Sequence, residues 1–147
     1  MRRNVTILSA LLLASAACGV RADGPPEIQV DRTACGHCRM LVSEPQYAAA
    51  YRARGAEALV FDDIQCLLDA ARKEPGPVRF WFRDAAGDSW IEGADTVFVR
   101  SNSLRTPMSG GIAAYRTRRA AEQAAKRDRG RIVLSFEELR AAAGDGS

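Results

Sequence analysis

Residues 58–71 read ALVFDDIQCLLDAA, and this stretch decides the fold because a strand passes directly into a helix within it. The apolar run 58–61 is typical of a strand. Asp62 can then cap a helix while Gln65, three residues later, reaches back to it in a capping box. An apolar stripe follows at helical spacing and predicts packing against a core by Ile64, Leu67, Leu68 and Ala71. Cys66 lies about 200° from the start of this stripe, so we do not expect it in the core.

The same pattern recurs later in the chain with a constant offset of 54 residues. The offset matches Phe61 with Tyr115, Leu67 with Ala121, Ala71 with Ala125, Gly76 with Gly130, and Val78, Phe80 and Phe82 with Ile132, Leu134 and Phe136. We interpret it as an α+β fold of two similar ββαβ halves, about 28–84 and 89–140, that form one compact unit. Each half would contain a methionine-bearing loop, with Met40 in the first and Met108 in the second. Chance similarity is the alternative, because a helix followed by a strand is common in α+β proteins.

Local patterns predict the remaining elements. With 147 residues, of which 47% are hydrophobic and 27% charged, the chain has enough apolar material for one modest core. Residues 47–51 are ambiguous between helix and strand. Strands are expected at 27–31, 40–42, 78–82, 89–91, 96–99 and 132–134, and helices at about 117–127 and from residue 136.

The N-terminus predicts export and lipid attachment. Two arginines precede the apolar run 5–17, which has the length of a signal-peptide core and is too short for a transmembrane helix. The run ends in SAAC at 15–18, which is similar to the lipobox of bacterial lipoproteins. We therefore predict a signal peptide at 1–17 and lipidation of Cys18. Ordinary cleavage after Ala16 or Ala22 is the alternative.

The lipid would hold the folded part at a membrane surface outside the cytoplasm. Residues 18–27 form the expected anchor and linker, and residues 28–147 the expected domain. Nothing in the sequence resembles a nucleic-acid module, a phosphate-binding loop or a Ser/His/Asp catalytic set. We therefore expect a binding protein rather than an enzyme.

The stretch TACGHCRM at 33–40 gathers donors that suit a soft metal. It contains Cys35, His37, Cys38 and Met40 within six residues. Thiolate, thioether and imidazole ligands suit Cu(I) or Zn(II) better than Mg(II) or Ca(II), which prefer oxygen. The stretch predicts a soft-metal site or thiol redox chemistry. A structural disulfide between the two cysteines is the alternative.

Two sulfur side chains outside this stretch are further candidates. Met108 lies in the loop 101–111, between Pro107 and a Ser-Gly-Gly turn, where few apolar neighbours are available to bury it. We therefore favour ligation over packing for Met108. Cys66 stays open between an auxiliary ligand and an incidental thiol. Asp62 and Asp63 are expected to cap the helix and complement its dipole.

Taken together, these motifs resemble the NosL family, exported and often lipid-anchored copper chaperones that serve nitrous oxide reductase. The resemblance rests on Cys18, Cys35-x-x-Cys38-x-Met40, Phe61-Asp62-Asp63-Ile64-x-Cys66, Trp90-Ile91 with Ala94, and Thr106-Pro107-Met108-x-Gly110. It implies an α+β fold, Cu(I) binding, and delivery to nitrous oxide reductase and its maturation machinery at the periplasmic face of a bacterial membrane. Arg39 stands where the family often has glycine.

From the residues and the resemblance we expect the reduced protein to bind one Cu(I). Met108 and a thiolate from Cys35 or Cys38 are the expected main ligands, with Met40 or His37 as supplementary ones. Thioethers bind more weakly than thiolates, so a mixed site can hold Cu(I) and still release it.

Two other functions use the same cysteines. Cys35-Gly-His-Cys38 is also the active-site sequence of thiol-disulfide oxidoreductases, where it comes after a long buried strand and opens a helix. Here only a short alternating segment precedes it, and Pro45 interrupts the segment on its C-terminal side. A structural zinc site would use Cys35, Cys38, Cys66 and His37, but His37 lies between two of its partners and would have to double back.

Overall fold

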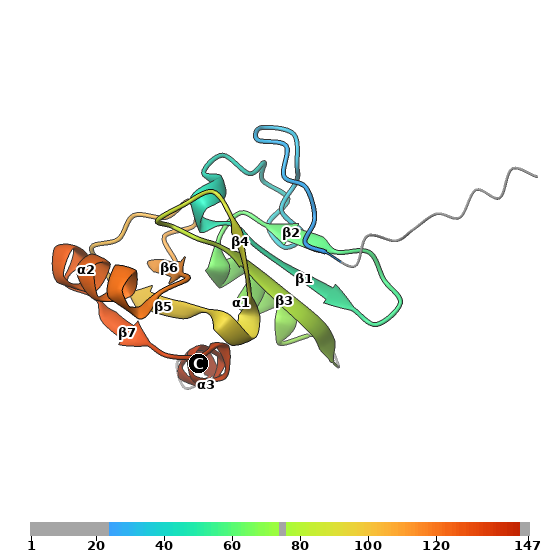
Figure 1. The fold of residues 1–147 in the computed structure, drawn as a ribbon. Helices are drawn as coiled ribbons and strands as arrows, with labels where there is room; N and C mark the ends of the chain where they lie inside the picture. Colours follow the sequence, from blue (N-terminus) through green and yellow to red (C-terminus); the bar gives the residue numbers. More distant parts are fainter. Residues whose placement is uncertain (1–23, 74–75, 145–147) are drawn as a thin grey trace, which may run out of the picture.

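The computed structural model describes residues 24–73 and 76–144 and shows two antiparallel sheets with three α-helices packed around them (Figure 1). The predicted signal peptide 1–17, the predicted lipidation of Cys18 and most of the linker 18–27 lie outside these residues. Within the described ranges, no helix is both long and apolar enough to cross a membrane.

The first sheet has the strand order β2-β1-β3-β4. Its half of the chain contains η1 (Pro45–Tyr47), β1 (Ala49–Ala53), β2 (Leu59–Phe61), α1 (Ile64–Ala71), β3 (Pro77–Arg83) and β4 (Trp90–Glu92). The central strand β1 pairs antiparallel with β2 and β3, so Ala50 lies between Val60 and Trp81. Of the segment 47–51, which was ambiguous between helix and strand, residues 49–51 belong to β1, while Tyr47 is the last residue of the 3-10 helix η1.

The second sheet repeats this arrangement with the order β6-β5-β7. Its half contains η2 (Gly93–Asp95), β5 (Val97–Arg100), β6 (Ile112–Tyr115), α2 (Arg118–Asp128), β7 (Arg131–Val133) and α3 (Phe136–Gly144). In both halves the first strand is central and the helix connects the other two. The helix caps, Asp63 and Thr117, are 54 residues apart, which equals the sequence offset. The predicted α+β fold of two ββαβ halves is confirmed.

The segment before β1 differs from its prediction. Residues 27–31 form no strand, because the amides of Arg32 and Thr33 turn back to the carbonyl of Gln29 at 3.0 and 2.8 Å. The strand expected at 40–42 is reduced to one antiparallel bridge, between Ala34 and Leu41. A local turn satisfies the backbone groups here, so alternating polarity alone does not produce a strand.

The two methionine loops are not equivalent, which corrects the prediction of one in each half. Met108 lies between β5 and β6, whereas Met40 lies before β1. The matching connection in the first half is the short turn 54–58 between β1 and β2, and it contains no methionine.

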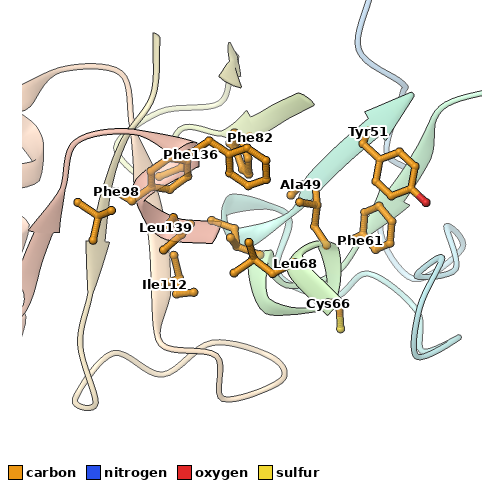
Figure 2. Packing of buried hydrophobic residues seen from close by; sticks show 14 of the residues in the cluster. Ala49, Tyr51, Phe61, Cys66, Leu68, Phe82, Phe98, Ile112, Phe136 and Leu139 are labelled. Atoms are coloured by element: carbon orange, nitrogen blue, oxygen red, sulfur yellow. The ribbon is translucent and has the colours of Figure 1, made fainter. Parts of the chain in front are cut away.

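Both halves contribute to the main core. The ring of Phe136, from α3, lies 4.3 Å from Phe80 and 5.2 Å from Phe82 between centroids. Phe82 in turn meets Phe98 edge-on at 4.8 Å. Figure 2 shows Phe82 and Phe136 side by side, with Leu139 of α3 close to them. Because this cluster joins β3 to β5 and α3, the two halves form one compact unit, as predicted.

Candidate metal centre

Three cysteines converge at the start of helix α1. The Sγ atoms of Cys35, Cys38 and Cys66 all lie within 4.8 Å of one another. All three are free thiols. Cys35 and Cys66 are buried, while Cys38 is partly exposed at the edge of the group. The structure therefore brings the two predicted cysteine ligands together with the third cysteine, whose role the sequence left open.

A tight turn places Cys35 and Cys38. The amide of Cys35 donates to the carbonyl of Met40 at 2.7 Å, and the amide of Arg39 donates back to the carbonyl of Cys35 at 3.1 Å. Arg39 has a φ of 67°, in the left-handed region, which fits the glycine often found there in the resembled family. The amide of Gly36 donates to the carbonyl of Val60 at 2.8 Å, so the turn is fastened to β2.

Cys66 is the third residue of α1 and is only 3% exposed, which corrects our expectation that it lies outside the core. The helix has two covered faces: its apolar stripe packs on the aromatic core, and the turn carrying Cys35 covers the face of Cys66. Figure 2 shows Cys66 at the edge of the cluster, directed away from Phe82 and Phe136. Helical periodicity alone could not show that a distant turn covers this second face of the helix. The sequence contained one indication: after the predicted lipidation of Cys18, three cysteines remain, so at least one thiol has no disulfide partner.

Hydrogen bonds concentrate on the sulfur of Cys35. The thiol of Cys66 donates to it, and the amides of Asp62, Cys38 and His37 also point at it, so the pKa of Cys35 falls to about 4 although burial opposes the shift. The same hydrogen bond, together with burial, raises the pKa of Cys66. The pair therefore holds one thiolate and one thiol at neutral pH. A thiolate is the form of cysteine that binds metals.

Two buried aspartates flank the group. Asp62 does not cap the helix as expected. Its Oδ1 accepts from the amide of Ser43 at 3.2 Å, and burial raises its pKa. Asp63 is the N-cap instead, accepting from the amide of Gln65 at 2.8 Å. Asp63 also accepts hydrogen bonds from the loop 101–111, a contact that the sequence did not predict.

The remaining candidate ligands lie at or near the surface. Met40 is 56% exposed and Met108 is 37% exposed. His37 is exposed and is not among the His, Cys, Asp and Glu donors that converge in the described part of the chain. The four-ligand zinc site that included His37 is therefore not formed in this geometry.

A comparison with solved structures connects this fold to a known protein. No family model matches the chain, and no curated protein matches it. The crystal structure of the copper chaperone NosL from Shewanella denitrificans does match, with a TM-score of 0.64 and 18% sequence identity over 78% of this chain and 96% of that one. The fold is thus NosL-like, and it carries a three-cysteine group that could bind a metal.

Proposed function

We propose that this chain is a metallochaperone that binds one Cu(I) in the three-cysteine group, with Met108 as a further ligand. The observation that carries the proposal is the convergence of three sulfur donors within 4.8 Å. Sulfur donors select Cu(I) over hard cations. Because Cys35 is already a thiolate at neutral pH, the site does not have to lose that proton before metal binds.

The partial exposure of the group suits transfer to a partner. Cys38 is partly exposed, whereas Cys35 and Cys66 are buried. An incoming sulfur ligand from an acceptor protein can therefore approach a bound metal beside Cys38, while Cys35 and Cys66 hold it on the buried side. Met40 and His37 are close to Cys38 in the sequence and exposed, and both stay supplementary candidates.

We further propose that the acceptor is nitrous oxide reductase with its maturation machinery. The chain would act at the periplasmic face of a bacterial membrane, tethered through lipid on Cys18. The signal-like N-terminus and the motifs shared with the NosL family support this assignment, and the NosL-like fold is consistent with it.

A thiol-disulfide oxidoreductase is the second candidate, because the pKa of Cys35 is as low as in such enzymes. Two features count against it. Cys35 is fully buried, so a protein disulfide cannot approach its sulfur. Cys35 also lies in a turn rather than at the start of a helix.

Metal binding by the reduced protein tests the proposal. We expect one Cu(I) per chain, measured by competition with a chromophoric Cu(I) ligand. Cys66→Ser should weaken binding strongly because it removes a buried donor. His37→Gln, which changes an exposed side chain outside the group, should leave most of the Cu(I) affinity.

In cells, Cys66→Ser should lower the copper content of nitrous oxide reductase. Zn(II) binding in preference to Cu(I), or insulin reduction that Cys35→Ser abolishes, would contradict the proposal.

A further inference from the structure

Asp63 is a fully buried carboxylate that joins the loop carrying Met108 to the helix carrying Cys66. Its Oδ1 caps α1 by accepting from the amide of Gln65 at 2.8 Å. Its Oδ2 faces the loop and accepts two more hydrogen bonds, from the hydroxyl of Thr106 at 2.6 Å and from the amide of Met108 at 3.0 Å. A buried carboxylate needs such donors, and here they come from two separate segments.

The rest of the loop is shaped to lie against the same helical turn. Thr106 is itself buried, and its hydroxyl oxygen accepts from the amide of Gly111 at 3.1 Å. Gly110 approaches the helix so closely that a Cβ there would lie 2.6 Å from both Asp63 Oδ1 and the Cβ of Gln65. The backbone of Met108 is therefore fixed on both sides, while its side chain is 37% exposed.

Capping alone does not explain an aspartate at this position. The equivalent cap in the second half, Thr117, accepts from the amide of Ala120 at 3.2 Å with a single hydroxyl. Asp63 has a second oxygen that takes no part in the cap and serves only the loop. Cys66 follows this N-cap by three residues and lies in the first turn of α1. One side chain thus fixes the backbone of Met108 against the start of the helix that carries Cys66.

We propose that Asp63 is a positioning residue for the metal: it holds Met108 at the three-cysteine group so that the thioether completes the coordination of Cu(I). This inference rests on the proposed function. Asp63 itself does not touch the metal, because its oxygens are taken up by the cap and the loop.

Asp63→Asn separates the cap from the loop contact. Asparagine and aspartate are equally good N-caps, so the oxygen facing Gln65 is kept. The loop-facing oxygen becomes an amide NH₂ group, which cannot accept from the amide of Met108. Met108→Leu and the double variant complete a cycle that isolates the coupling between the two residues. Thr106→Val is a second route to the same loss, because valine has a similar shape and no hydroxyl.

The readouts are Cu(I) affinity, the number of sulfur neighbours of copper by X-ray absorption, and exchange of the Met108 amide in the apo protein. Asp63→Asn should lower Cu(I) affinity about threefold to tenfold, remove one sulfur neighbour and speed the exchange. In the Met108→Leu background the same change should alter affinity by less than about twofold. Thr106→Val should follow the same pattern, and it decides the question if Asp63→Asn does not fold.

The outcomes separate the two proposals. An equal loss of affinity in both backgrounds would mean that Asp63 has only a structural role, and it would overturn the inference. Unchanged affinity in Asp63→Asn with sulfur-bound Cu(I) in the wild type would also overturn it, but would leave the proposed function standing. Failure of the wild-type protein to bind Cu(I) through sulfur would remove both.

Discussion

At the scale of single residues, the three-cysteine group is organised around one negative charge. Cys35 is buried, yet the thiol of Cys66 and three backbone amides stabilise its thiolate more than burial destabilises it. Burial raises the pKa of the adjacent Asp62, and the negative charge of Cys35 adds to this shift. The fold thus stabilises one charged sulfur within the three-cysteine group.

This thiolate predicts a distinctive dependence of stability on pH. Between the pKa of Cys35, about 4, and the ordinary thiol pKa, the folded pair holds one proton while the unfolded chain holds two. Unfolding takes up a proton in this window, so the free energy of unfolding should rise with pH. Above the ordinary thiol pKa the unfolded chain loses both protons while Cys66, with its raised pKa, keeps one, so stability should fall again.

Urea unfolding of the reduced apo protein at a series of pH values measures this effect. The difference between wild type and Cys35→Ser removes the contribution of other titrating groups. Cys38→Ser is the matched control, because it keeps both members of the Cys35–Cys66 pair and should retain the wild-type profile. If the free energy of unfolding changes with pH in the same way for wild type and Cys35→Ser, then Cys35 has the pKa of an ordinary thiol and the prediction is wrong.

The residue types predicted a soft-metal site, and the structure shows three cysteines that converge. The proximity of Cys35 and Cys38 was predictable because residues close in sequence are close in space. Cys66 was not, because its burial depends on a turn that packs on the helix from a distant part of the chain. The double role of Asp63 could not be predicted for the same reason. A helix cap can be predicted from neighbouring residues, but the second carboxylate oxygen accepts hydrogen bonds from a loop more than forty residues away.

At the scale of elements, the loop 101–111 depends on a close approach of its two ends. The amide of Ser101 donates to the carbonyl of Gly111 at 2.8 Å. Gly111 has a φ of +64°, and a Cβ there would collide with the carbonyl oxygen of Ser101. Glycine is the residue that tolerates both the positive φ and the close approach to Ser101, so Gly111 allows the loop that carries Met108 to close.

Gly111→Ala and Gly55→Ala form a matched pair that isolates this approach. Gly55 has a φ of +76° but open space around its Cβ position. Gly55→Ala should therefore cost only the left-handed strain, ~1–2 kcal/mol. Gly111→Ala should cost about 1–3 kcal/mol more, because the new methyl group overpacks the loop. Chemical denaturation measures both, and equal costs would show that the ends of the loop can move apart.

Element order was largely predictable because each half repeats the same strand, cap and helical stripe. The offset of 54 holds from Asp63 and Thr117 through the helices to the strands after them. It ends at Leu134, which lies beyond β7 and is exposed, whereas its partner Phe80 lies within β3. Phe136 then begins α3, whereas its partner Phe82 lies within β3. The segment 27–31 was mistaken for a strand because its alternating polarity carries no information on whether a neighbouring strand exists.

At the scale of the whole molecule, the halves share a core rather than forming two small ones. Phe136 is 5% exposed and contacts rings from both sheets: Phe80 and Phe82 of β3, and Phe98 of β5 at 6.3 Å. A half of this size could bury little apolar surface alone. The three-cysteine group, built on α1 and the turn beside it, therefore depends on packing supplied by the second half.

Phe136→Ala tests this dependence. Truncating a buried phenylalanine should lower the free energy of unfolding by ~3–5 kcal/mol. Both tryptophans, Trp81 and Trp90, lie in the first sheet, whereas Phe136 belongs to the second half. If the molecule unfolds as one unit, tryptophan fluorescence should report the full loss of stability, and its transition should coincide with that seen by circular dichroism, which senses both halves.

Leu134→Ala, two residues away but 52% exposed, is the control and should change stability by no more than ~0.5 kcal/mol. A fluorescence midpoint that stays at the wild-type value while circular dichroism shifts would show that the halves unfold separately.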